Sequence, residues 1–121
     1  LLAQTGRFNE VQPHWRSLFL NAGSDGPEIS RSFVLMSLQR FQVDHALRVI
    51  EVWKKDFPLD PEPYFQEGRI AGVGLRWQDA ERAYRQAEER APHRLDVREG
   101  LVESLMKQLK LDEAIDELQK L

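Results

Sequence analysis

The chain has 121 residues, of which 41% are hydrophobic and 31% charged, a composition typical of a folded domain. Its net charge is -3, so it lacks the positive field that binding to phosphate backbones generally needs, and no nucleic-acid partner is expected. It has no cysteine, which excludes disulfides and thiolate metal ligands, and no apolar run long enough to span a bilayer. These properties leave the compartment open; a soluble chain is expected, with the cytoplasm slightly favoured.

The first part of the chain, residues 1–22, predicts only part of a helical hairpin. Phe8, Val11 and Trp15 lie at helical spacing within residues 6–20, which indicates one helix after a turn. The start lacks Met, and the chain is expected to be a piece of a longer one. Residues 21–27 then form a loop rich in turn-forming residues.

The rest of the chain predicts three pairs of helices. The first pair covers residues 27–40 and 43–56. The second lies within residues 61–92, where two helical patterns meet at the short join Gly74-Leu75-Arg76-Trp77, too short for anything but an antiparallel pair. The third covers residues 95–108 and 111–121. Seven helices are therefore expected, one from residues 1–22 and two from each pair.

The central pair resembles a tetratricopeptide repeat (TPR), a helix-turn-helix unit of 34 residues with small and aromatic residues at fixed places. Those places hold Tyr64, Gly68, Ala71, Ala80, Tyr84, Ala87 and Pro92. The same interval leads back to Ala46, Ile50, Trp53 and Pro58 and forward to Ala114, Leu118 and Leu121. Two leading aromatic places are filled differently, by Ser30 and Arg98.

The resemblance implies a fold class and a domain division. It implies an all-α protein, a TPR-type right-handed superhelix of antiparallel helix pairs (an α-solenoid), with about seven helices. One array would fill residues 1–121, with a partial repeat at 1–22, repeats at 27–60 and 61–94, and a repeat lacking its end at 95–121.

In TPR proteins the first helices of successive repeats line a concave groove that holds a peptide, and the resemblance carries this groove to three segments of the chain. Its residues would be Arg31, Leu35, Leu38, Gln39, Glu62, Phe65, Arg69, Val73, Asp96, Glu99, Glu103, Met106 and Lys107. The late part is acidic and the groove also holds apolar residues, so we expect a ligand segment with a basic and an apolar part. The places that grip the carboxylate of chaperone tails in one family subtype keep only Arg31, which argues against that ligand.

No catalytic, cofactor-binding or metal-binding residues are expected. The three histidines His14, His45 and His93 share no ligand spacing. Glu99 and Glu103 lie one turn apart, but a solvated helix face explains them better than acid-base catalysis. The glycines of the segment GRIAGVG fall within a helical pattern, where close helix packing explains them better than a phosphate loop.

Three functions remain open at this stage. The first is a non-enzymatic scaffold that binds a peptide or protein in the groove. The second is a spacer or self-assembly module, a homo-oligomer formed through the uncapped apolar ends at Leu1-Leu2 and Leu118-Leu121. The third is the accessory TPR segment of a larger enzyme.

Overall fold

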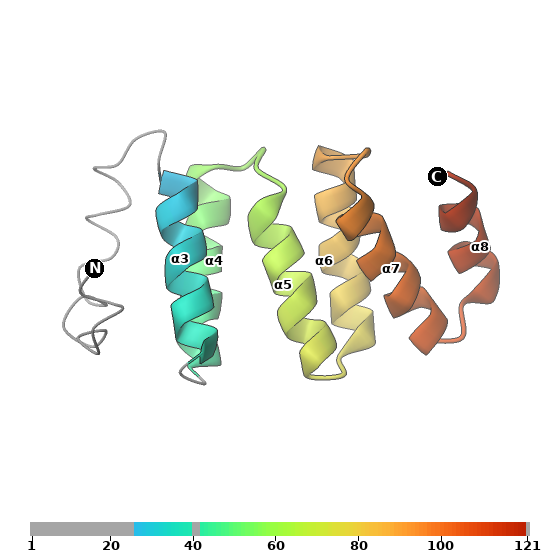
Figure 1. Ribbon diagram of the computed structural model, residues 1–121, viewed down its shortest axis with the longest axis horizontal. Helices are drawn as coiled ribbons and strands as arrows, with labels where there is room; N and C mark the ends of the chain where they lie inside the picture. The colour runs from blue at the N-terminus through green and yellow to red at the C-terminus, as the bar shows by residue number, and fades with distance from the viewer. Residues whose placement is uncertain (1–25, 40–41, 121) are drawn as a thin grey trace. The chain divides into compact units, whose positions relative to one another are not determined.

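A computed structural model describes residues 26–39 and 42–120, and every regular element in these ranges is an α-helix. The helices form three hairpins (Figure 1). Their bounds are α3 (Gly26–Gln39) and α4 (Val43–Asp56), α5 (Glu62–Val73) and α6 (Trp77–Arg90), and α7 (Leu95–Lys107) and α8 (Leu111–Gln119). The predicted pairs are confirmed, whereas the helix predicted within residues 6–20 lies outside the described residues. The chain divides into two compact units, residues 1–57 and 58–121.

The turn inside each hairpin is closed by the same backbone hydrogen bond. An N–H donates to the carbonyl five residues earlier, which is the pattern of a Schellman motif that satisfies a carbonyl at the helix end. The bonds join Gln42 to Ser37 (2.8 Å), Arg76 to Ala71 (2.9 Å) and Lys110 to Leu105 (2.9 Å). Because these bonds recur at one interval of 34 residues, the periodicity of the sequence is also a periodicity of the backbone.

Two of these turns contain a leucine in the left-handed region of backbone space. Leu75 has a φ of 60° and Leu109 a φ of 62°. This region favours glycine, because a Cβ there approaches the following carbonyl oxygen. Both leucine side chains are exposed, so neither gains core packing in return.

The first unit is built around the apolar face of α4. Ala46, Ile50 and Trp53 are fully buried there, as their spacing predicts, and Val34 of α3 is buried as well. Ser30, where the repeat pattern leads with an aromatic residue, is also fully buried. This difference from the repeat pattern therefore places a small side chain, in place of an aromatic ring, in the packed interior of the first unit.

The second unit is built around Tyr84 of α6, whose side chain is 6% exposed. Its ring lies between two glycines, Gly68 of α5 and Gly100 of α7. A Cβ at Gly68 would lie 2.7 Å from a ring carbon of Tyr84, and a Cβ at Gly100 would lie 2.5 Å from another. Close approach thus explains Gly68, as predicted, and it also explains Gly100, for which the sequence predicted no packing role.

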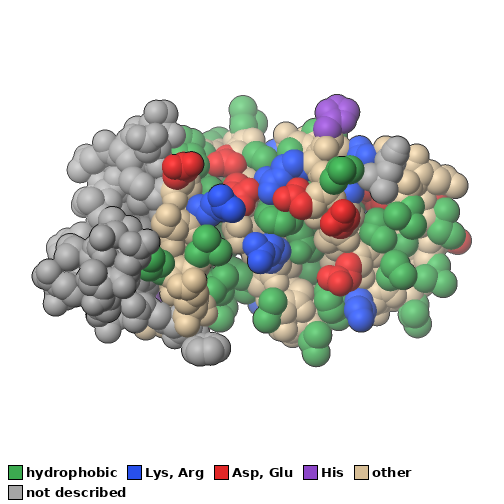
Figure 2. Space-filling view, in the orientation of Figure 1, with side chains coloured by type: hydrophobic (Ala, Val, Ile, Leu, Met, Phe, Trp, Pro, Cys, Tyr) green, Lys and Arg blue, Asp and Glu red, His purple; other side chains and the backbone are tan. Residues whose placement is uncertain are grey.

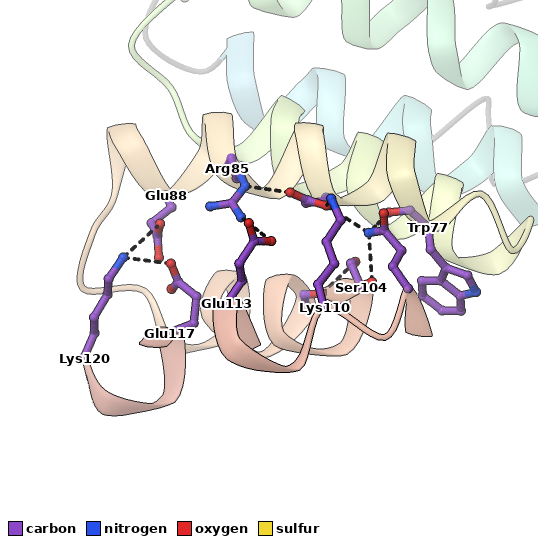
Figure 3. A network of polar contacts seen from close by, with 11 residues as sticks. Trp77, Arg85, Glu88, Ser104, Lys110, Glu113, Glu117 and Lys120 are labelled. Carbon is purple, nitrogen blue, oxygen red and sulfur yellow. Dashed lines mark hydrogen bonds and ion pairs between the residues drawn. The ribbon is translucent and has the colours of Figure 1, made fainter. Parts of the chain in front are cut away.

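A polar network joins α6 to the end of α7 and to α8 (Figure 3). Its centre is the buried carboxylate of Glu81, which accepts hydrogen bonds from Arg85 (2.9 Å), Gln108 (2.9 Å) and Lys110 (3.0 Å). Burial by itself raises the pKa of Glu81, but the three donors outweigh it and lower that pKa below its usual 4.5. The charge of Glu81 is therefore compensated where it is buried.

Two further carboxyl groups meet at the other end of the same interface. Lys120 lies 2.8 Å from Glu117 and 4.0 Å from Glu88 (Figure 3). Burial and a hydrogen bond with the neighbouring Glu117 raise the pKa of Glu88. The pair therefore tolerates a shared proton better than two full charges, and Lys120 balances the charge that remains.

The position of the glycines predicts opposite effects of two similar substitutions in α5. Gly68→Ala should lower the free energy of unfolding by about 1–2 kcal/mol, because overpacking against Tyr84 outweighs the better helix propensity of alanine. Gly72→Ala should raise it by up to about 1 kcal/mol, because a Cβ there would meet Trp77 only at 3.4 Å. Denaturant unfolding measures both, and a stabilised Gly68→Ala protein would contradict the packing described.

The lowered pKa of Glu81 predicts a loss of stability in acid. A carboxyl group whose folded pKa is lowered stabilises the protein above its unfolded pKa, and this contribution disappears as the pH falls through the folded pKa. The free energy of unfolding should therefore fall between about pH 5 and pH 3, and less steeply in Glu81→Gln. The control is Glu89→Gln, an exposed carboxyl on the same helix, which should keep the wild-type profile.

Candidate protein-binding groove

The first helices of the second and third hairpins, α5 and α7, lie side by side (Figure 1). An open hollow of about 500 Å³ lies along them. We call it the α5–α7 groove. It is lined by Phe65, Arg69, Gly72, Val73, Trp77, Tyr84, Asp96, Glu99, Gly100 and Glu103. Figure 2 shows acidic and basic side chains among hydrophobic ones on this face of the molecule. All of these residues belong to the second unit.

One end of the groove is an aromatic and cationic cluster around Phe65. The Phe65 ring is half-buried and lies 6.0 Å from the ring of Tyr84, in a tilted arrangement. The guanidinium of Arg94 lies over Phe65 at 4.7 Å and that of Arg69 at 5.8 Å. These contacts hold Phe65 against the core while part of its ring faces the groove.

Arg94 also ties α5 to the start of α7. It lies 2.8 Å from Glu62 and 2.8 Å from Asp96, with two parallel hydrogen bonds to the Asp96 carboxylate. The hydrogen bonds from Arg94 lower the pKa of Asp96 more than burial raises it. Two of the predicted partner-contacting acids are thus ion-paired within the chain. The acidic character expected of the late groove comes from Glu99 and Glu103, and Asp96 is largely neutralised.

Glu99 and Glu103 form a ridge on α7 between two hollows. Both are exposed and line the α5–α7 groove, and both also line a second hollow of about 350 Å³ beside α8. That second hollow includes Met106, which is 52% exposed, and Lys107. Lys107 lies over the ring of Trp77 at 5.8 Å. The predicted groove residues of α7 are therefore all at the surface.

The predicted groove residues of α3 belong to the first unit and form a separate set. Arg31, Leu35 and Gln39 are exposed, and Leu38 is half-buried. Of the residues predicted on α5 and α7, six line the α5–α7 groove: Phe65, Arg69, Val73, Asp96, Glu99 and Glu103. Glu62, Met106 and Lys107 lie outside its lining, and the α3 set is described only within its own helix.

Sequence reasoning missed part of the groove lining. The predicted set of groove residues omits Gly72, Trp77, Tyr84 and Gly100, all of which line the hollow. Tyr84 belongs to both the core and the groove, because its ring is buried while its side chain also lines the hollow. The signal available in the sequence is the residue type itself. Phenylalanine would pack equally well at a buried position, so a tyrosine there indicates that its hydroxyl group has a role.

The remaining sequence candidates are possible metal ligands and the glycines of the segment GRIAGVG. No three histidine, aspartate or glutamate side chains there form a group that could hold a metal ion. Gly68 and Gly72 lie inside α5 and Gly74 directly after it, which confirms the helical interpretation of that segment. Among the same residues, no helix is long and apolar enough to cross a membrane.

Helix hairpins that recur every 34 residues with the same closing hydrogen bond define a helical-repeat fold of the α-solenoid class. No family model and no curated protein matches the sequence. Among solved structures, the chain is similar to MamA of AMB-1, a TPR-containing protein, with a TM-score of 0.72 and 17% sequence identity. The alignment covers 98% of this chain and 64% of that chain, so this chain spans less than two thirds of the MamA chain. At this identity the similarity shows a TPR-like fold.

Proposed function

We propose that the chain is a non-enzymatic scaffold that binds a segment of another protein in the α5–α7 groove. The observation that carries this proposal is the groove itself, an open hollow in which exposed apolar side chains stand beside charged ones. Val73 is 88% exposed, and Phe65, about two turns earlier on α5, is half-buried. Such a surface offers apolar anchors together with polar groups that fix orientation, as protein-binding surfaces do.

The shape of the groove favours a chain segment over a small molecule. The hollow is open to solvent along α5 and α7, so it cannot enclose a compact ligand on all sides. An extended or helical segment lying across both helices would cover Val73 and reach the acidic ridge at Glu99. The exposed position of both Glu99 and Glu103 also fits a surface that meets a partner better than an acid-base pair, whose two carboxyl groups need contrasting surroundings.

A second function, self-association, is favoured by the apolar surface of α8. Leu111, Ile115 and Leu118 are each about half exposed, at 54%, 49% and 49%. Hydrophobic side chains gather at this end of the molecule in Figure 2. A second copy of the chain could cover them, since exposed apolar patches mark association surfaces.

The scaffold proposal predicts that Val73 contributes to binding. Peptides selected from a displayed library of random 12-residue sequences, and then synthesised, should bind Val73→Ser about 5-fold to 10-fold more weakly than wild type, because an apolar contact is lost. The matched control is Leu59→Ser, since Leu59 is 83% exposed but lies in the turn before α5. Equal affinities of both variants and the wild type would reject the groove as the binding surface.

Self-association predicts a concentration-dependent mass in sedimentation equilibrium. Ile115→Glu with Leu118→Glu should shift the species toward monomer, because two charges would then face the association surface. A wild-type chain that stays monomeric at high concentration would exclude this second function.

A further inference from the structure

The floor of the α5–α7 groove contains a polar group without a partner. The side chain of Tyr84 is only 6% exposed, yet it lines the groove. No hydrogen bond within residues 26–39 and 42–120 uses its hydroxyl group, and this oxygen is not among the fully enclosed unpaired side-chain atoms, so it still meets solvent. A hydroxyl group that meets water at the floor of a groove can exchange that water for a polar group of a bound segment.

The two glycines keep that hydroxyl accessible. A Cβ at Gly100 would lie 2.5 Å from Cζ of Tyr84, the carbon that carries the hydroxyl. Gly100 itself lines the groove. Any side chain there would therefore press on the end of the Tyr84 ring that faces the groove, and glycine leaves it open.

The charges around the hydroxyl favour a cation. The side chains that line the groove include three carboxylates, Asp96, Glu99 and Glu103, and one guanidinium, Arg69. Asp96 is already paired with Arg94, whereas no ion pair involves Glu99 or Glu103 among the described residues. Burial first, and then the charges of Glu103 and Asp96, raise the pKa of Tyr84 to about 12, against the opposing effect of Arg69. The hydroxyl therefore stays neutral at physiological pH and can accept a hydrogen bond from a cation.

We propose that the α5–α7 groove selects protein segments that carry a lysine or arginine beside an apolar residue, and that the cationic group binds Glu99, Glu103 and the hydroxyl of Tyr84. The aliphatic stem of such a side chain can lie against the apolar lining while its charged end reaches the acids. The neighbouring apolar residue then lies against Val73. This inference rests on the proposed function and adds the chemistry of the partner.

The test uses the full 121-residue chain and peptides selected from the random 12-residue library. The selected peptides should share a lysine or arginine next to an apolar residue. Replacing that lysine by norleucine, or that arginine by an uncharged analogue of equal length, should weaken binding about tenfold. Tyr84→Phe should weaken binding of the basic peptide several-fold but leave binding of the uncharged peptide unchanged, because only the cation uses the hydroxyl.

Two controls separate this contact from a change in folding. Tyr64→Phe removes another tyrosine hydroxyl, one that accepts a hydrogen bond from Arg90 outside the groove, and should leave binding unchanged. Glu99→Gln with Glu103→Gln alters only exposed side chains and should abolish most of the salt dependence of binding. Unfolding curves should show that each variant is folded.

The possible results distinguish the two proposals. Peptides that bind wild type, lose affinity for Val73→Ser and yet carry no basic residue would overturn this inference and leave the proposed function standing. The same holds if Tyr84→Phe binds basic and uncharged peptides as wild type does. If no selected peptide depends on Val73, both proposals fail.

Discussion

The second unit depends on one packing constraint, the insertion of a tyrosine ring between two glycines. Gly68 and Gly100 come from α5 and α7, and the ring of Tyr84 comes from α6, so one side chain sets the approach of three helices. Close packing of this kind leaves little tolerance for added volume. It also determines the groove, because the helices that hold the ring are the ones that form the groove walls. Stability and the candidate binding surface therefore share a single residue.

Charged groups reinforce this arrangement at two places. Arg94 bridges α5 and the start of α7 through Glu62 and Asp96, above the ring of Phe65. Glu81 connects α6 with the end of α7 and the start of α8. Each of these charges is partly shielded from water, and each meets several donors or acceptors, which is the condition under which a shielded ion pair is tolerated. The groove acids Glu99 and Glu103 differ from them in having their charges exposed.

The sequence predicted the helix hairpins because their determinant is local and periodic. Small residues such as Gly68 and Ala80, at fixed intervals, specify both the helical period and the faces that pack. The left-handed backbone conformation of Leu75 and Leu109 could not be predicted, because leucine does not indicate such a conformation. Long-range pairings were also out of reach. Arg94 meets Glu62 across 32 residues of sequence, and nothing in either residue's neighbourhood indicates its partner.

The leucines in the turns have a consequence for protein engineering. Leu75 and Leu109 hold equivalent places in successive hairpins, and each keeps a backbone angle that glycine or asparagine would adopt more easily. Their side chains are 72% and 79% exposed, so the conformational strain is not offset by burial. Glycine or asparagine at these two positions should therefore raise the melting temperature without altering the core or the groove.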